Sequence, residues 1–110
     1  MLRSRKPKPS PGPAELAHDP VAAAEWARLA PLIQRSRTMT ESDRAALLTL
    51  CQQWSYYVDA TAQVARLGLV VKAPSGAPMA NPYLQIADRA HEQCAKLRRA
   101  LCLYAVAGAE

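Results

Sequence analysis

The chain has 110 residues, which is the length of one domain, and half of them are hydrophobic, with no Phe, two Trp and four Tyr. A core of Leu, Val, Ile and Ala favours closely packed helices over a β-sandwich. The formal net charge is +5, yet no apolar run approaches the roughly 20 residues that cross a bilayer, and phosphate-loop, GxGxxG, HExxH and GxSxG motifs are missing from the sequence. We therefore expect neither a membrane-bound nor a secreted protein, and no recognisable class of enzyme.

Residues 1–18 are predicted to form a flexible basic arm. The first thirteen residues contain four Pro and four basic residues without an acid, so they account for +4 of the net charge of +5 and leave +1 for residues 14–110. Such a segment cannot bury enough apolar surface to fold alone, but it can lie along a polyanion. A solubilising tail is the alternative. The arm supplies four candidate DNA-binding residues: Arg3, Arg5, Lys6 and Lys8.

A first helix is predicted to begin at Asp19-Pro20, because Asp caps free amides and Pro suits the first helical position. Apolar residues then recur at spacings of four, three and four, which places one stripe on the helix: Ala22, Trp26, Leu29 and Ile33. Glu25 is expected elsewhere on the surface. Pro31 removes one backbone hydrogen bond, so a kink or an early end is expected there.

A second helix is predicted over residues 41–67. Thr40 and Asp43 resemble a capping box at its start, and Gly68 suits its end. Its apolar stripe consists of Leu47, Cys51, Trp54, Val58, Ala62 and Ala65. Residues 69–81 combine a short β-prone run with a turn cluster, so a small hairpin or an ordered loop is expected between the helices.

A third helix is predicted from Pro82, which Asn81 precedes as a cap, to about Tyr104. Its stripe consists of Tyr83, Ile86, Ala90, Cys94, Leu97, Leu101 and Tyr104. The fold class is therefore all-α: a short N-terminal helix laid across one end of a long antiparallel hairpin with a β-prone connector. The helical domain covers residues 19–104, and residues 105–110 form a tail.

The stripes of the two long helices are nearly heptad-like, and a thin hairpin leaves part of them uncovered. We therefore expect the chain to form a homo-oligomer. The residues predicted to hold it together are Trp54, Val58, Cys94, Leu97 and Leu101. In the alternative, the first helix and the 69–81 loop cover this surface within one chain.

The three cysteines indicate a reducing cytoplasm rather than a disulfide framework, because their number is odd and no CxxC is present. His91, Cys94 and Cys102 lack further ligands at suitable spacing for a tetrahedral metal site. No metal and no cofactor are expected. Isolated polar groups such as Asp59, Asp88 and His91 are the best candidates for catalysis, but such carboxylates usually belong to solvated surface.

The ordered set of motifs resembles the small subunit of phage terminases of the P27 type. The residues that carry the likeness are Pro20, Glu25-Trp26-Ala27-Arg28-Leu29, Pro31-Leu32, Met39-Thr40-Glu41-Ser42-Asp43, Leu50-Cys51, Trp54 to Tyr57, Gly68-Leu69-Val70, Gly76 and Asn81-Pro82. They extend over about residues 20 to 100. The tail departs from the pattern, because Tyr104 to Glu110 lacks the Pro and Arg of related tails.

The resemblance implies a non-enzymatic, ring-forming subunit that recognises double-stranded viral DNA in the host cytoplasm and passes it to a large subunit with ATPase and nuclease activity. Within the fold, the turn between the first two helices comes nearest to a helix-turn-helix. The candidate DNA contacts around it are Arg28, Arg35, Arg37 and Arg44. Two alternatives remain: a small helical DNA-binding regulator, and a structural helical oligomer that does not bind DNA.

Overall fold

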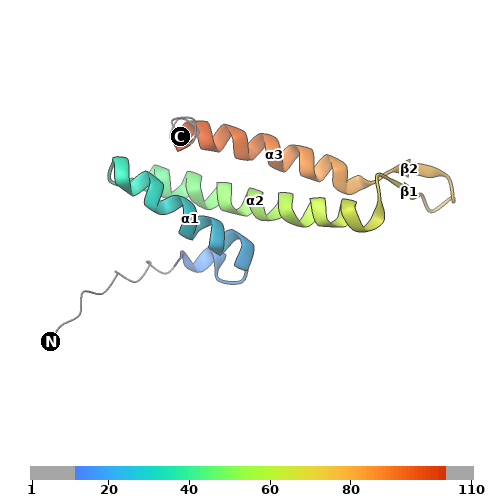
Figure 1. Cartoon of the computed structure of the whole chain (residues 1–110), viewed down its shortest axis with the longest axis horizontal. Helices are drawn as coiled ribbons and strands as arrows, with labels where there is room; N and C mark the ends of the chain where they lie inside the picture. The colour runs from blue at the N-terminus through green and yellow to red at the C-terminus, as the bar shows by residue number, and fades with distance from the viewer. Residues whose placement is uncertain (1–11, 104–110) are drawn as a thin grey trace.

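The computed structural model describes residues 12–103. In chain order its elements are η1 (Ala14–Leu16), α1 (Pro20–Ser36), α2 (Glu41–Leu67), β1 (Val70–Lys72), β2 (Pro78–Ala80) and α3 (Pro82–Ala100). Helices α2 and α3 form a long antiparallel hairpin, with the two strands projecting from its turn and α1 packed along the N-terminal half of α2 (Figure 1). The predicted all-α class, the helical hairpin and the small β connector are confirmed.

Helix α1 begins where the sequence predicts, because the Asp19 carboxylate accepts a hydrogen bond of 3.1 Å from the amide of Ala22. The expected early end at Pro31 is wrong, since the helix continues to Ser36. Pro31 itself is exposed, whereas Ala30 and Ile33 on either side are buried against α2 and the core. Burial of this last part of the stripe offsets the backbone hydrogen bond that Pro31 removes.

Helix α2 has the predicted bounds, and both halves of its capping box are formed. The Thr40 hydroxyl accepts a hydrogen bond from the Asp43 amide, and the Asp43 carboxylate accepts one from the Thr40 amide, each of 3.0 Å. Helix α3 ends at Ala100 rather than near Tyr104, with Leu101 as its cap. Cys102 has a φ of 62°, outside the right-handed helical region, so the α-helix cannot continue through it. The predicted end near Tyr104 is therefore wrong.

The two strands form an antiparallel ribbon in which Val71 pairs with Met79. Asn81 fixes the join between this ribbon and the helices: its amide Nδ2 donates to the Gly68 carbonyl at 2.9 Å, and its Oδ1 accepts from the Tyr83 amide at 3.0 Å. The Asn81 side chain is only 1% exposed, so both of its polar ends are satisfied inside the fold.

The main core lies in the half of the hairpin that α1 covers. Its largest buried residues come from η1, α1, α2, α3 and the segment just after α3: Leu16, Trp26, Leu29, Ile33, Leu47, Leu50, Cys51, Cys94, Leu101 and Leu103. Leu16 also shows that the packed fold starts before residue 19. In the uncovered half only narrow strips are buried, among them Ala60 and Ala87.

The predicted stripes therefore extend too far along the hairpin. Ala62 and Ala65 of α2 are exposed, and Ile86 of α3 is 46% exposed. Helix α1 covers only the N-terminal half of α2, so beyond that half each long helix packs mainly against the other one. A helix with a single neighbour buries a narrower strip than a helix with two neighbours.

Candidate nucleic-acid interface

Three helix ends meet at the end of the rod away from the ribbon (Figure 1). The C-terminus of α1, the N-terminus of α2 and the C-terminus of α3 lie there, and their basic residues make up a surface that we call the basic end. It consists of Arg35, Arg37, Arg44, Lys96 and Arg99. Sequence reasoning missed the last two, although an antiparallel hairpin returns the end of the third helix to the start of the second.

Arg37 links all three helix ends. Its Nη2 lies 3.0 Å from Asp43 Oδ1, in the capping box of α2, and donates to the Leu101 carbonyl at 3.3 Å. The hydrogen bond from Arg37 is the main reason that the pKa of Asp43 lies below its ordinary value, and the same contact raises the pKa of Arg37. Arg37 therefore holds the α1–α2 turn against the end of α3.

Arg35 is an exposed predicted DNA contact at the basic end. It lies in the last turn of α1, is exposed, and has no hydrogen bond or ion pair with any other residue in the range 12–103. A guanidinium in this condition can contact a phosphate without first leaving a carboxylate. Arg37 and Arg44, by contrast, form ion pairs with acidic residues. To bind a phosphate, each arginine would have to share itself with its carboxylate partner or leave it.

Arg28 lies apart from this turn, in a cluster around Glu25. Its Nε and Nη2 donate to both carboxylate oxygens of Glu25, at 2.9 and 2.8 Å, while Arg98 Nη2 from α3 donates to Oε2 at 3.2 Å. Glu25 is 5% exposed, so its predicted place on the surface is wrong. Its partner Arg98 lies 73 positions away in the chain, and a local pattern cannot reveal such a contact.

The candidate contacts Arg3, Arg5, Lys6 and Lys8 lie outside the described residues. The structure does describe the segment from which they extend. Residue Glu15 of η1 lies beside Arg44 at the start of α2, with Nη2 3.2 Å from Oε1, and Leu16 is buried in the core. The Glu15–Arg44 ion pair therefore connects η1, near the start of the described residues, to the basic end.

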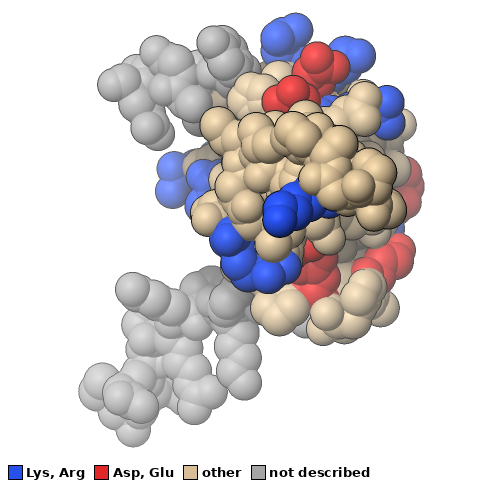
Figure 2. Space-filling view, turned by 90° about the vertical axis from the view of Figure 1, so that its right-hand side faces the viewer, with Lys and Arg blue, Asp and Glu red and all other residues tan. Residues whose placement is uncertain are grey.

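The opposite end of the rod has a different character. Residues 67–80 contain one charged residue, Lys72, and several exposed apolar side chains: Leu67, Leu69, Val70 and Met79. Figure 2 looks onto this end and shows a largely uncharged surface nearest the viewer, with blue and red side chains mostly around it. The two ends of the molecule therefore differ in charge and in exposed apolar surface.

The predicted assembly residues are not all on the surface. Cys94 and Leu101 are each 2% exposed within the core, and Leu97 packs against that core. Trp54 is half-buried, with its ring stacked 5.7 Å from that of Tyr57 and the Arg98 guanidinium 5.7 Å from its centroid. These contacts are made within one chain.

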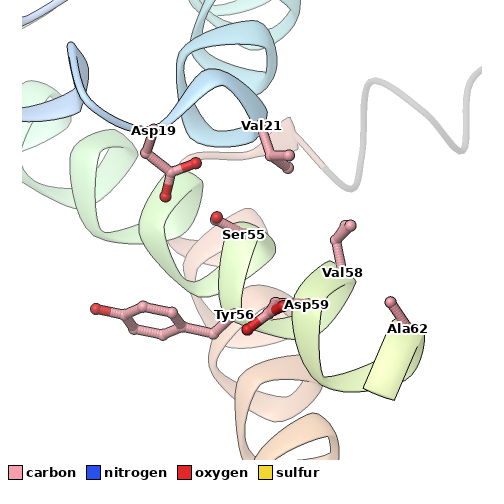
Figure 3. A pocket seen from close by; sticks show the side chains of 7 residues that line it. All are labelled: Asp19, Val21, Ser55, Tyr56, Val58, Asp59 and Ala62. Carbon is pink, nitrogen blue, oxygen red and sulfur yellow. The ribbon is translucent and has the colours of Figure 1, made fainter. Parts of the chain in front are cut away.

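Val58 lies in a shallow groove of about 430 Å³ between the start of α1 and the middle of α2 (Figure 3). The groove is lined by Asp19, Val21, Ser55, Tyr56, Val58, Asp59 and Ala62. Hydrogen bonds from the Ser55 hydroxyl and from the Ala22 amide keep the pKa of Asp19 below its ordinary value. Since Tyr56 is 53% exposed and Val21 is 37% exposed, the groove offers apolar surface to a second molecule.

Within residues 12–103, no three His, Cys, Asp or Glu side chains are arranged to hold a metal ion. The helices described there are also too short or too polar to cross a bilayer. His91 packs near Tyr57, with 5.9 Å between ring centroids.

Comparison with known proteins agrees with the motifs and the helical fold. Neither the curated proteins nor the solved structures that were searched gave a match. Residues 22–108, most of the chain, match the family described as phage terminase, small subunit. The match includes α1 except for its first two residues, both long helices and the ribbon between them. The chain therefore belongs to the phage terminase small-subunit family.

Proposed function

We propose that this chain is the DNA-recognition subunit of a phage packaging terminase. It binds double-stranded viral DNA in the host cytoplasm, assembles into a ring-type homo-oligomer and regulates a large subunit that carries the ATPase and nuclease activities. The chain itself does not hydrolyse nucleotides. Membership of the small-subunit family supports the role, and the arrangement of basic residues supports where the DNA would bind.

The observation that carries the DNA proposal is the contact between Glu15 and Arg44. It anchors the segment that follows Arg3, Arg5, Lys6 and Lys8 beside the α1–α2 turn. Phosphates bound by these four residues would therefore run close to Arg35, whose guanidinium is exposed. The N-terminal segment would supply affinity, and the basic end would position the duplex.

Charge alone makes this binding sensitive to salt. Each phosphate that a Lys or Arg neutralises releases counterions from the duplex, so affinity falls as salt concentration rises. An oligomer presents one basic segment per copy, and neighbouring segments act on the same duplex at high effective concentration. Removing residues 1–9 should therefore weaken binding to all duplexes alike and flatten the salt dependence.

The test is a titration of fluorescent duplexes with the full chain, a chain lacking residues 1–9, and the single variants Arg35→Ala and Arg66→Ala. Arg66 is the matched control, because it is an exposed helical arginine near the ribbon rather than at the basic end. We expect the truncation and Arg35→Ala to weaken binding, with Arg66→Ala close to the parent chain. Unchanged affinity and salt slope in the truncated chain would disprove the role of the N-terminal segment.

The assembly and regulatory parts of the proposal are tested separately. Native mass in solution, with and without duplex DNA, distinguishes a ring from a monomer. Purified large subunit then reports regulation through its rate of ATP hydrolysis in the presence and absence of this chain. A chain that stays monomeric and leaves that rate unchanged, yet binds DNA, would instead be a small helical DNA-binding regulator.

A further inference from the structure

The ribbon of β1 and β2 has two edges that differ in their capacity to bind another strand. The backbone N–H of Asn81 donates to the Leu69 carbonyl, and the backbone N–H of Ala73 donates to the Ala77 carbonyl, each at 2.8 Å. Hydrogen-bonded pairs alternate along an antiparallel ladder, so Val71 and Met79 also bond to each other. The backbone groups of the residues between these pairs point outward.

On the β2 edge, one of these outward positions is Pro78, which has no N–H to donate. On the β1 edge the outward positions are Val70 and Lys72, and each offers both an N–H and a carbonyl. Proline blunts an edge strand against pairing. The β1 edge is therefore the one equipped to accept a strand.

A further strand on the β1 edge would also stabilise the ribbon. Each strand has three residues, and Val70 and Leu69 are each 63% exposed. An isolated two-stranded ribbon is marginally stable in water, and it gains stability from further strands with an apolar face or from packing against a helix. Figure 1 shows the ribbon projecting beyond the helices, where another molecule can reach the β1 edge.

We propose that β1 pairs with β1 of a second copy of the chain, antiparallel and about a two-fold axis at Val71. The ribbons then form one four-stranded sheet in the order β2-β1-β1-β2. In this register Val70 of each copy lies opposite Lys72 of the other, and the pair exchanges both backbone hydrogen bonds. The same edge serves both copies, which is what a two-fold interface requires.

Lys72 selects this register over its neighbours. Moving the axis to Lys72 places two ammonium groups directly opposite each other, and like charges at such positions are destabilising. Moving it to Val70 leaves Lys72 opposite Gly68, the capping glycine of α2, which has a φ of 91° and is not extended. The axis at Val71 avoids both arrangements.

This inference deepens the proposed self-assembly and does not depend on DNA binding. A two-fold contact closes at two copies, so a ring would need a second, lateral contact along the helices. The ribbon contact then joins copies in pairs at their uncharged ends, leaving the basic ends facing outward.

Disulfide trapping tests the register. In a chain carrying Cys102→Ser, which removes the exposed native thiol, a Val71→Cys substitution places two cysteines in a non-hydrogen-bonded pair with about 4.5 Å between Cα atoms. Val70→Cys and Lys72→Cys are matched controls. In the proposed register, residue 70 of one copy lies two residues along the strand from residue 70 of the other copy, and the same holds for residue 72. The two Cα atoms are then roughly 8 Å apart, beyond disulfide reach.

We expect mild oxidation to give a covalent dimer with Val71→Cys and little with the two controls. A second pair of variants tests the edge itself: Val70→Pro removes an outward N–H from β1, and Ala80→Pro removes the corresponding one from β2. Only Val70→Pro should prevent cross-linking at position 71. Circular dichroism checks that all variants keep their helices.

Three results would overturn the pairing. Cross-linking through position 70 or 72 would mean another register, and equal loss with Ala80→Pro would mean another edge. An oligomer that forms with no cross-link at any of the three positions would place a different occupant on the ribbon while leaving the proposed function intact. A chain that forms the Val71→Cys cross-link but does not bind DNA would contradict the proposed function and leave the ribbon pairing intact.

Discussion

Arg98 of α3 contacts Glu25 of α1 at 3.2 Å while its guanidinium lies 5.7 Å from the centroid of the Trp54 ring on α2. One side chain thus connects the three helices through an ion pair and a cation–π contact. The carboxylate at the centre is almost fully buried and accepts hydrogen bonds from two arginines. A buried charge of this kind is costly unless its partners remain.

The two arginines should therefore act together in stability. Arg28→Ala is expected to have a small effect, because Arg28 is 59% exposed, and Arg98→Met should cost about 1–3 kcal/mol. Removing both leaves the Glu25 carboxylate without either arginine, and should cost about 3–5 kcal/mol, more than the sum of the single effects. Urea unfolding at one fixed protein concentration measures this. Additive effects would show that the cluster does not function as a unit.

Stability should fall in acid because of three carboxylates. The pKa values of Asp43, Asp19 and Glu15 lie below their ordinary values of 3.8, 3.8 and 4.5. Such groups bind protons more tightly in the unfolded chain, so their stabilising effect is present above these ordinary values and is lost as pH falls through the lower folded-state values. Thermal midpoints between pH 7 and pH 2.5 should show this loss.

The Asp43→Asn variant isolates the contribution of the Asp43 carboxylate to this loss of stability in acid. The variant cannot form the ion pair with Arg37, so it should be less stable than the parent chain at pH 7 and lose less stability on acidification. Parallel curves for the two proteins would contradict the assignment of this carboxylate. Asp88→Asn serves as the control, because Asp88 is an exposed carboxylate on α3.

The three thiols should differ in reactivity. Burial raises the pKa of Cys51 to about 12 and raises that of Cys94, whereas Cys102 is exposed. At pH 8 on the order of one Cys51 in ten thousand is then a thiolate, which is the reactive form. A thiol reagent should label one cysteine per native chain, and Cys102→Ser should abolish this labelling. Rapid labelling of all three without denaturant would mean that the core opens readily.

Local capping chemistry could be predicted from the sequence because each cap involves neighbours in the chain. Asp19, Thr40 with Asp43, and Asn81 all cap helices where the residues predict. The extent of burial could not be predicted, since Ala65 and Ile86 belong to the predicted apolar stripes and are nevertheless exposed. A periodic stripe shows which face is apolar, but not how much of it a neighbour covers.

The candidate site was predictable to a similar degree. The turn carrying Arg35, Arg37 and Arg44 follows from the two helix boundaries, and the structure places these residues at one end of the rod. The contribution of α3 depends on how the hairpin aligns, which the sequence implies only through its connector. Contacts such as Arg37 with the Leu101 carbonyl, 64 positions apart, depend on tertiary packing alone.

Gly68 should resist substitution for a conformational reason. Its φ of 91° lies where residues with a Cβ are strained, and it ends α2 at the point where the ribbon begins. Gly68→Ala should lower the free energy of unfolding by about 1–2 kcal/mol. Gly12→Ala is the control, because its φ is ordinary and an added Cβ would lie 3.9 Å from Trp26, a normal contact. Equal stability of the two variants in urea would contradict the expectation.

The groove around Val58 gives the last prediction, which concerns lateral assembly. If a second copy covers this apolar surface, Val58→Glu must bury a carboxylate without a partner in the oligomer, but can hydrate it in the monomer. The dissociation constant should rise at least tenfold, which is about 1.4 kcal/mol. Sedimentation or mass photometry at micromolar concentration measures the change in mass.

Because Val58 is half-buried, Tyr56→Glu provides a second test in the same groove at a side chain that is 53% exposed and not needed for the core. Thr49→Glu is the control: it is exposed and lies on α2 about two turns before Tyr56, outside the set of residues that line the groove. All three should keep the helical content of the parent chain. If both groove variants and the control retain the native mass, the lateral contact lies elsewhere on the hairpin, because a charge cannot remain inside an apolar interface without weakening it.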